Sequence, residues 1–435
     1  MKKVLAELLT IGDEILYGQI VDTNSQWMSV ALDKVGIKVI RKTSVGDQED
    51  EILTALAEAE KRADIILITG GLGPTSDDIT KPCLAKYFDC ELAIHEEALA
   101  EVTEFFKSRG RELTEINRKQ AALPVCCAKI KNSIGTAPGM WFEKNARLPA
   151  LRIPTLSGGG GPDGQGKVFV SMPGVPHEMK RMMSEIVIPK LLQHFTTPII
   201  FHKVIRTVGI GESILAEKIA AWEKALPEHI KLAYLPNLGE VKLRLTAFGN
   251  NLVQLQQEAE DLVKKVIPLA REYIYSQQDE SLEVVIGNLL REKKLTLSIA
   301  ESCTGGFVSH LITSVPGSSE YFQGSIIPYS YEIKMQQLGV KAETLQQYGA
   351  VSEQTVTEMA ELVRKKFNTS VGVATSGVAG PGGATPEKPV GTIWIAFADG
   401  QNVITKKLQL SKDRLINIRM ASVAVLNLIR LNLTR

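Results

Sequence analysis

A short apolar segment constrains the fold of the first part of this chain. Residues 64–69 read Asp-Ile-Ile-Leu-Ile-Thr, with no alternation between apolar and polar side chains. Such a run is typical of a strand that is buried on both faces of a parallel sheet. Around it, the apolar spacing predicts strands over 4–9 and 37–40 and helices over 23–35 and 50–62. This order of strands and helices predicts a three-layer α/β domain over residues 1–175.

The pattern changes after residue 175 and returns to α/β near residue 281. Residues 176–252 predict a small α+β module, whose first helix, over 176–195, is expected to be broken near Pro189. Residues 253–280 predict a linker helix and strand, and residues 281–435 predict a second α/β domain. We therefore expect two three-layer α/β domains joined by the small module.

Two serines in the last domain precede helical apolar patterns. Ser352 precedes an expected helix that runs to Phe367. Ser411 precedes the long helix that is expected at the end of the chain. Serine is a favoured N-cap residue because its hydroxyl oxygen accepts a backbone N–H of the first turn. Both serines are therefore predicted to cap helices.

Composition narrows the class of protein. The chain has 435 residues, too many for one ordinary core, and a net charge of +1 that gives no general attraction to nucleic acid or to an anionic membrane. No apolar run approaches the ~18 residues of a membrane span, and the first residues do not resemble a signal peptide. The five cysteines show no C-x-x-C spacing, so we expect reduced thiols in a cytoplasmic protein.

The segment Ala300–Gly306, with the sequence Ala-Glu-Ser-Cys-Thr-Gly-Gly, lies between an expected strand and an expected helix. Such a junction presents free backbone N–H groups and the positive end of a helix dipole. Ser302 is therefore a candidate nucleophile, and Gly305 and Gly306 let the backbone approach a bound carbonyl. The pattern alone leaves a second interpretation open, in which Ser302 only caps the helix.

Two later segments carry further candidate residues. Tyr329 and Lys334 follow an expected strand, and a tyrosine near a lysine can accept a proton, although this pair is also typical of a wet surface. The segment Ser376–Gly383 contains four glycines between two apolar strands, so its N–H groups can converge on an anion such as a phosphate. An ordinary long turn is the alternative for this segment.

Together these segments resemble the CinA/PncC family of nicotinamide-nucleotide amidases. The resemblance rests on about 150 residues in the right order, and it is carried by Ala300–Gly306, Pro316–Ser319, Tyr329-Ser330 with Lys334, Leu338–Val340, Gly349–Ser352 and Ser376–Gly391. It implies hydrolysis of the carboxamide of nicotinamide mononucleotide to nicotinate mononucleotide and ammonia, without a metal or other cofactor.

The resemblance also implies roles for individual residues. Ser302 corresponds to the nucleophile, Tyr329 to the base and Lys334 to an assisting residue. The substrate-binding residues that it implies are Thr304, Gly305, Gly306, Ser376, Gly377, Gly380, Gly382 and Gly383. One departure is that Thr375-Ser376-Gly377 stands where relatives often carry Ser/Thr-Gly-Ile. A hydroxyl is retained there, so we expect no loss of activity.

A glycine-rich loop also follows the apolar strand at 64–69. Residues 69–78 read Thr-Gly-Gly-Leu-Gly-Pro-Thr-Ser-Asp-Asp and open an expected helix, where backbone amides can approach a phosphate. Asp77 and Asp78 suit the first turn of a helix, and they could also hold a divalent cation that bridges a diphosphate. Both interpretations remain open from the residues alone.

This region, about residues 1–175, resembles the molybdopterin-binding-type domain of MoaB and MogA in its CinA form. The resemblance implies metal-dependent hydrolysis of ADP-ribose to AMP and ribose 5-phosphate, with Mg, Mn or Co, alone or together with K. Gly71, Gly73 and Thr75 then contact the diphosphate, and Asp77 and Asp78 bind the metal. The same fold also binds pterins without hydrolysis, so a molybdopterin-binding protein is an alternative.

Residues 176–252 resemble the KH-type domain of CinA proteins. A nucleic-acid-binding KH domain has a Gly-x-x-Gly loop, whereas the segment here reads Gly209-Ile-Gly-Glu212. We therefore expect a linking and dimerisation module in a homodimer, with nucleotides rather than nucleic acid as partners and no membrane contact. A binding protein related to competence or DNA damage is the rival interpretation.

Overall fold

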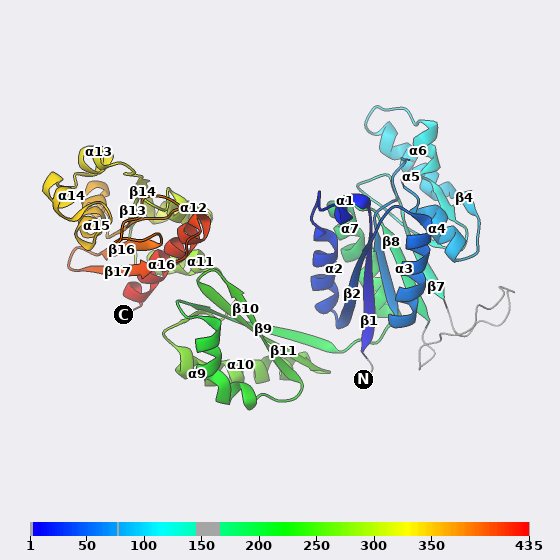
Figure 1. The fold of residues 1–435 in the computed structure, drawn as a ribbon. Helices are drawn as coiled ribbons and strands as arrows, with labels where there is room; N and C mark the ends of the chain where they lie inside the picture. Colours follow the sequence, from blue (N-terminus) through cyan, green and yellow to red (C-terminus); the bar gives the residue numbers. More distant parts are fainter. Residues whose placement is uncertain (1–2, 76–77, 145–165, 435) are drawn as a thin grey trace. The chain divides into compact units, whose positions relative to one another are not determined.

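The computed structural model describes residues 3–75, 78–144 and 166–434. Its contacts divide the chain into two compact units, residues 1–201 with 248–252 and residues 202–247 with 253–435 (Figure 1). The mixed α/β, multidomain fold class predicted from the sequence is confirmed.

The first unit is built on a six-stranded sheet. Its order is β2-β1-β3-β8-β7-β6, and the first four of these strands are parallel. The strands are β1 (Val4–Ile11), β2 (Ile37–Val45), β3 (Ile65–Thr69), β6 (Ala128–Ile130), β7 (Gly139–Lys144) and β8 (Lys167–Met172). Every residue of β3 is buried, as the unbroken apolar run predicts.

Helices cover both faces of this sheet and make three layers. One core includes Met28, Leu32 and Met179, and the other includes Ile52, Leu56 and Leu84. The helices of the first face are α2 (Thr23–Asp33), α7 (Pro176–Met182) and α8 (Ile188–His194), and those of the second are α3 (Glu49–Arg62), α4 (Thr80–Tyr87) and α5 (Glu96–Lys107).

The helical segment after residue 175 differs from its prediction. A π-helical turn, Met183–Val187, joins α7 to α8, so the expected break near Pro189 is absent and the proline lies in the first turn of α8. Pro189 has no N–H to donate to the preceding turn, and the π-helical turn directly before it is the local departure from α-helical geometry that accommodates this loss. Met179, Met183 and Leu191 pack in the core of the first sheet, although the sequence pattern places this segment in the next module.

Smaller elements complete the first unit, namely α1 (Asp13–Leu16), β4 (Leu92–Ile94), α6 (Glu115–Lys119) and β5 (Ala122–Pro124). β4 and β5 are antiparallel, with Leu92 opposite Pro124, and Cys90 forms a disulfide with Cys126 just beyond this pair. The expectation of reduced thiols is therefore wrong for these two cysteines, because the strand pairing brings together residues that are 36 positions apart. Cys83, Cys127 and Cys303 are free.

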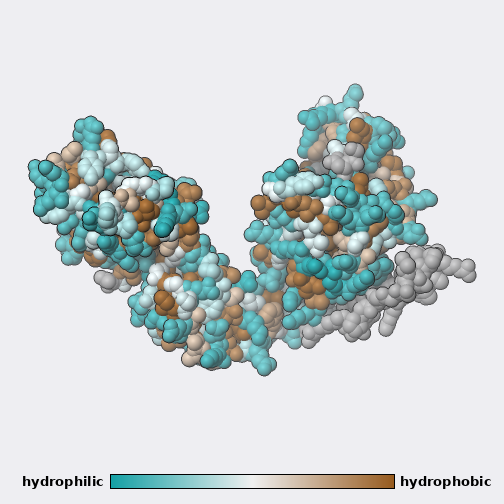
Figure 2. Space-filling view, viewed as in Figure 1, coloured by the Kyte–Doolittle hydropathy of each residue, from teal (hydrophilic) through white to brown (hydrophobic). Residues whose placement is uncertain are grey.

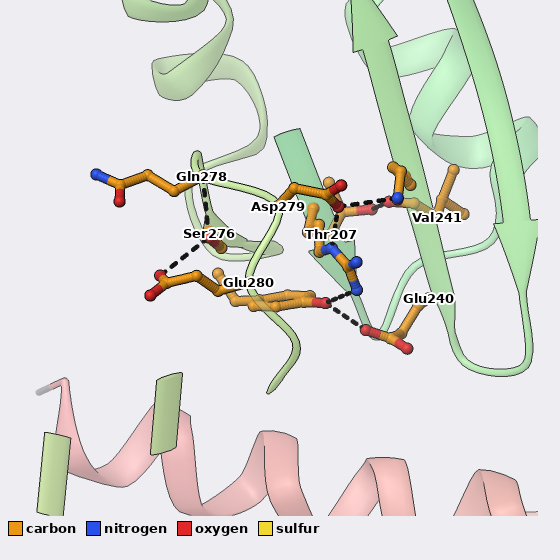
Figure 3. A network of polar contacts seen from close by, with 10 residues as sticks. Thr207, Glu240, Val241, Ser276, Gln278, Asp279 and Glu280 are labelled. Carbon is orange, nitrogen blue, oxygen red and sulfur yellow. Dashed lines mark hydrogen bonds and ion pairs between the residues drawn. The ribbon is translucent and has the colours of Figure 1, made fainter. Parts of the chain in front are cut away.

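The second unit begins with a four-stranded sheet of order β10-β11-β9-β12 and two helices. These elements are β9 (Ile199–Val208), α9 (Glu212–Lys224), β10 (Ile230–Asn237), β11 (Glu240–Gly249), α10 (Leu252–Ala270) and β12 (Ile274–Ser276). Figure 3 shows how the segment after β12 folds back onto β9 and β11. Asp279 accepts a hydrogen bond from Arg206 (2.7 Å) and pairs with Lys242 (2.8 Å), while the hydroxyl of Tyr275 donates to Glu240 (2.5 Å). These contacts fix the path of the chain into the last domain.

The last domain is a five-stranded sheet of order β14-β13-β15-β16-β17. β13 is parallel to β14 and β15, and the last two strands are antiparallel. The strands are β13 (Leu297–Glu301), β14 (Phe322–Ile326), β15 (Val371–Gly377), β16 (Thr392–Ala398) and β17 (Val403–Gln409). Its helices include α11 (Leu282–Glu292), α12 (Phe307–Thr313) and α16 (Arg414–Leu433) on one face, and α14 (Ala342–Tyr348) and α15 (Glu353–Phe367) on the other.

The two predicted caps have different outcomes. The hydroxyl of Ser352 accepts the N–H of Thr355 at the start of α15, so this prediction is confirmed. The prediction for Ser411 is wrong, because α16 begins later and its cap is Asp413, which accepts the N–H of Ile416. The hydroxyl of Ser411 instead accepts the N–H of Asp413 and so supports the cap.

By length and composition, α16 is the one helix of the described residues that could cross a membrane, with a mean hydropathy of 1.2. It contributes Val425, Leu426 and Ile429 to the core of the last domain, which is the ordinary place for an apolar helix of a folded domain. Figure 2 shows that the face of the molecule in view is largely hydrophilic, with separate small apolar patches on both units.

A buried carboxylate in β1 gives a test of the first unit. Glu7 is fully buried and accepts hydrogen bonds from Arg62 Nη2 (2.9 Å) and Nε (3.1 Å) and from the Thr43 hydroxyl (3.1 Å). We expect Glu7→Gln to lower the free energy of unfolding of this unit by about 2–4 kcal/mol. The substitution removes the negative charge of the buried residue and so breaks its ion pair with Arg62.

Urea unfolding measures this loss. Glu58→Gln is the matched control, because Glu58 is an exposed partner of the same Arg62 and exposed pairs contribute at most about 1 kcal/mol. Equal losses in the two variants would contradict a special role for the buried contact.

Candidate active site

Ser302 lies directly after β13, in the tight turn that leads to α12. Only 8% of the residue is exposed, and its N–H donates to the carbonyl of Thr375 at 3.0 Å. α12 begins after Gly306, and no side-chain hydroxyl caps it. The hydroxyl of Ser302 therefore does not serve as the helix cap that the sequence left open, and it is free for another contact.

That contact is with Lys334. The two residues are 32 positions apart, and Lys334 Nζ lies 3.0 Å from Ser302 Oγ. Lys334 begins a π-helical turn (Lys334–Leu338) and is 1% exposed. Its amine also donates to the carbonyls of Pro328 (2.7 Å) and Tyr329 (3.3 Å). Burial lowers the pKa of Lys334 to about 8, because a charged ammonium loses its hydration inside the protein.

As an ammonium, Lys334 donates to three oxygens, the hydroxyl of Ser302 and the carbonyls of Pro328 and Tyr329. Loss of one proton changes only the contact with Ser302. An uncharged lysine has two N–H donors and one lone pair. The carbonyls of Pro328 and Tyr329 take the two donors, and the lone pair is then left for the hydroxyl proton of Ser302. Lys334 is therefore placed to withdraw a proton from Ser302.

Cys303 is the other possible nucleophile, because it lines the same cavity beside Ser302. Burial raises the pKa of its thiol to about 12. A thiol with that pKa is protonated near neutral pH, and the protonated form is a poor nucleophile. Ser302 is therefore the stronger candidate.

Ser302 and Lys334 open onto a cavity of about 430 Å³. The glycine-rich segment 376–383 also lines this cavity, with Gly380, Gly382 and Gly383 among its wall residues. Among the described residues, the N–H groups of Gly382 and Gly383 have no hydrogen-bond acceptor. They are available to bind an anion from the substrate.

Two cations on the cavity wall were not singled out as binding residues from the sequence. Arg414 donates to the carbonyl of Gly380 (2.8 Å) and to the hydroxyl of Tyr329 (2.9 Å), and Lys388 donates to the carbonyl of Tyr348 (2.8 Å). Arg414 is the first residue of α16, more than a hundred positions from Ser302, so no local motif connects them. For Lys388, the only feature of the sequence that could have indicated a binding role is its position just after the glycine-rich segment.

The cavity contains some of the predicted substrate-binding residues and not others. Those that line it are Ser376, Gly377, Gly380, Gly382 and Gly383, together with Ser302, Tyr329 and Lys334. Thr304, Gly305 and Gly306 are not among the lining residues. The N–H of Gly305 donates to the carbonyl of Ser302 (3.2 Å) and that of Gly306 donates to Glu301 (3.0 Å), so both donors are already engaged.

The position of Tyr329 does not bring its hydroxyl into contact with Ser302, as a direct role as base would need. Its side chain is largely exposed at the cavity and accepts the hydrogen bond from Arg414, whereas its backbone carbonyl contacts Lys334. The group that directly contacts Ser302 is Lys334, so the assignment of Tyr329 as base stays a prediction.

The first unit has a second candidate site at the carboxyl edge of its parallel strands. β1 lies between β2 and β3 in the sheet. The connection from β1 to β2 therefore runs over one face of the sheet, and the connection from β2 to β3 runs over the other. Ligands of open α/β sheets bind at such a reversal of strand order. A Cβ at Gly70 would lie 2.0 Å from the carbonyl oxygen of Ile11, so glycine is needed where the loops after β1 and β3 meet.

The predicted diphosphate and metal residues lie in the loop after β3. The carboxylate of Asp78 accepts the N–H of Gly73 (2.7 Å) and both the N–H (2.9 Å) and hydroxyl (2.5 Å) of Thr75, so it closes this loop. Gly71, in the same loop, has a left-handed φ of 61°. Asp77 lies outside the described residues. Among the described residues, no three His, Cys, Asp or Glu side chains are grouped to hold a metal ion, so they do not form a metal site by themselves.

Family models cover almost the whole chain. Residues 7–193 match a probable molybdopterin binding domain, residues 202–276 match the damage-inducible protein CinA KH domain, and residues 279–433 match the CinA C-terminal domain. A CinA-like protein of Cytophaga hutchinsonii is 52% identical over 427 residues, which are 98% of this chain and 97% of that relative. The chain belongs to the CinA family.

A second relative agrees with this assignment. A CinA-like protein of Flavobacterium psychrophilum is 44% identical over 411 residues, 94% of each chain. Among solved structures, a CinA superfamily protein of Klebsiella pneumoniae is 27% identical and covers 35% of this chain and 96% of its own, with a TM-score of 0.35. The CinA of Thermoplasma acidophilum, described as of unknown function, is 33% identical and covers 43% of this chain and 99% of its own, with a TM-score of 0.36.

The contact between Lys334 and Ser302 makes the reactivity of Ser302 depend on pH. Lys334 must lose its proton before it can accept one, so reactivity should rise with pH through about 8. At pH 7 about a tenth of the lysine is neutral, and at pH 9 about nine tenths. We expect the rate at which phenylmethylsulfonyl fluoride modifies Ser302, followed by intact mass, to rise about tenfold between these pH values.

Ser302→Ala defines the background labelling in this experiment. In Lys334→Met the rise near pH 8 should disappear. A pH profile that is the same in wild type and Lys334→Met would show that another group activates Ser302.

Proposed function

We propose that the C-terminal domain hydrolyses the carboxamide of nicotinamide mononucleotide to nicotinate mononucleotide and ammonia. The observation that carries this proposal is the buried contact of Lys334 with Ser302, opening onto a cavity that also holds Lys388 and Arg414. An amide of a phosphorylated nucleotide needs both features, a nucleophile for the amide and a cationic wall for the phosphate.

The reaction follows from these contacts in two steps. Neutral Lys334 takes the hydroxyl proton of Ser302 as Ser302 Oγ attacks the amide carbon, and the ammonium formed beside the oxyanion stabilises its charge. The proton then passes to the departing nitrogen, ammonia leaves and an ester remains on Ser302. Lys334 next withdraws a proton from water, which attacks the ester. The proton on Lys334 returns to Ser302 Oγ as the acid leaves and ionises to the carboxylate product.

The glycine segment and the two cations hold the other end of the substrate. The free N–H groups of Gly382 and Gly383 provide donors to phosphate oxygens, and Arg414 provides a charge next to the carbonyl of Gly380. Such contacts place the amide carbon near Ser302, which lowers the entropic part of the barrier.

Substitutions separate the proposed roles. We expect Ser302→Ala to abolish ammonia release and Lys334→Met to lower kcat by about a thousandfold, because the nucleophile or its direct proton acceptor is missing. Tyr329→Phe should act mainly on KM, about tenfold, because its hydroxyl contacts Arg414 rather than Ser302.

Coupled ammonia detection and chromatography of the nucleotides measure these changes. Ser314→Ala, which removes an exposed hydroxyl from the end of α12, should keep wild-type activity. Loss of kcat in Tyr329→Phe with activity retained in Lys334→Met would instead assign the base to Tyr329.

We further propose that the N-terminal domain hydrolyses ADP-ribose to AMP and ribose 5-phosphate. The support is the reversal of strand order at β1 together with the glycine loop that Asp78 closes. A divalent ion, Mg, Mn or Co with possible help from K, belongs to this proposal and not to the amidase.

Asp78→Ala tests the second site. We expect it to lower ADP-ribose hydrolysis by more than about tenfold, because the Gly73–Thr75 loop loses its hydrogen-bond acceptor, and to leave amide hydrolysis unchanged. Nucleotide chromatography with and without EDTA measures both activities. Glu112→Ala is the control, because it removes an exposed acidic residue of the same unit. Equal loss of both activities in Asp78→Ala would contradict two separate sites.

The rival function in nucleic-acid binding has little support in the KH-like module. The loop Gly209–Glu212 packs toward α16, since a Cβ at Gly209 would lie 2.9 Å from Nδ2 of Asn427. This loop also lines a cavity with Val423 and Met420 of the same helix. We therefore propose that this module joins domains and does not clamp a nucleic-acid backbone.

A further inference from the structure

Glu301 is a fully buried carboxylate that immediately precedes the nucleophile. It accepts five hydrogen bonds: from the N–H groups of Gly306 (3.0 Å), Val308 (3.0 Å) and Ser309 (2.8 Å), and from the hydroxyls of Ser309 (2.6 Å) and Thr304 (2.7 Å). Among the described residues no cation forms an ion pair with it. Its charge is therefore balanced by hydrogen-bond donors of the turn and the first turn of α12.

The ionised carboxylate fixes the direction of a chain of hydrogen bonds. A carboxylate only accepts, so the Thr304 hydroxyl must donate its proton to Glu301. The hydroxyl oxygen of Thr304 also lies 2.8 Å from that of Thr375. Since the proton of Thr304 is already used, Thr375 donates to Thr304. The order is Thr375 to Thr304 to Glu301.

This chain joins the two halves of the candidate active site. Thr375 lies in β15, one position before the glycine-rich segment that begins at Ser376, and its carbonyl accepts the N–H of Ser302. Thr304 lies in the nucleophile turn. Both threonines are buried, at 2% and 0% exposure, and neither lines the cavity. Their hydroxyls therefore act on the reaction through the residues they hold.

We propose that Thr304 and Thr375, oriented by Glu301, are positioning residues that set Ser302 relative to the glycine segment. This inference rests on the proposed amide hydrolysis, and it assigns Thr304 a role behind the nucleophile in place of substrate contact. The hydroxyl pair holds the turn against β15, so that Ser302 Oγ stays within reach of both Lys334 and an amide carbon placed by the segment 376–383.

Isosteric substitutions test the proposal. Thr304→Val keeps the shape of the side chain and removes the hydroxyl, whereas Thr304→Ser keeps the hydroxyl. We expect Thr304→Val to lower kcat for nicotinamide mononucleotide by about tenfold or more with KM within about twofold, and Thr304→Ser to stay within about threefold of wild type. Thr313→Val, which removes an exposed hydroxyl bonded to the carbonyl of Ser309 in the same helix, should leave kcat unchanged.

A double-mutant cycle separates positioning from general damage. If the two hydroxyls act as one unit, Thr304→Val combined with Thr375→Val should lose no more activity than the larger single loss. Independent, multiplying losses would overturn the proposal, as would an unchanged kcat in Thr304→Val. A loss of kcat that Thr304→Ser does not restore would also overturn it, because the hydroxyl would then not be the cause.

A second measurement does not depend on the substrate. The rate at which phenylmethylsulfonyl fluoride modifies Ser302 should fall in Thr304→Val and recover in Thr304→Ser, with thermal unfolding recorded for each variant. If wild type hydrolyses no nicotinamide mononucleotide while this pattern holds, the proposed function fails and the positioning role stands. If wild type is active and the labelling rate does not change in Thr304→Val, the positioning role fails.

Discussion

A buried negative charge organises the turn from which the candidate nucleophile projects. Removing a carboxylate from water costs several kcal/mol, and hydrogen bonds to a charged group return roughly 1.5–3 kcal/mol each. Glu301 can therefore be buried only if the backbone brings enough donors to it. The turn after β13 and the start of α12 do this, and they do it with N–H groups that would otherwise be free at a helix start. The cost is that these groups can no longer bind an oxyanion, so the positive end of α12 is neutralised by the protein itself.

The same reasoning explains why a lysine can serve where no histidine is present. Lys334 is nearly without exposed surface, and the loss of hydration that makes an ammonium unfavourable there lowers its pKa to about 8. Two carbonyls take its N–H donors, and Ser302 is the remaining neighbour. Burial thus raises the fraction of unprotonated amine that can accept a proton, and the fold places that amine beside Ser302. Glu301 and Lys334 are two buried ionisable groups near Ser302, one surrounded by five hydrogen-bond donors and the other with a pKa that desolvation lowers toward neutral pH.

Local patterns were enough to predict the parts of this structure that depend on neighbouring residues. The unbroken apolar run predicted β3, and Ser352 predicted the start of α15. The contacts that make the site are between residues far apart in sequence, such as Lys334 with Ser302 and Arg414 with Gly380. The local pattern left Tyr329 and Lys334 open as an ordinary surface pair, and the resemblance to a known family favoured a catalytic role for them. The errors have the same origin. Asp413 replaced Ser411 as a cap because both are good caps and only the position of α16 decides between them, and the Cys90–Cys126 pair depends on the antiparallel contact of β4 with β5.

The two candidate sites use a carboxylate to close a glycine-containing turn, but the consequences differ with exposure. Asp78 accepts from Gly73 and Thr75 in a loop that is open to solvent, where water or a ligand can replace these donors at little cost. Its bonds are therefore compatible with a loop that rearranges when a diphosphate binds. Glu301 has no exposed surface, so none of its donors can be replaced without leaving a buried charge unsatisfied. A turn held in that way is fixed before substrate arrives, as the proposed covalent catalysis by Ser302 requires.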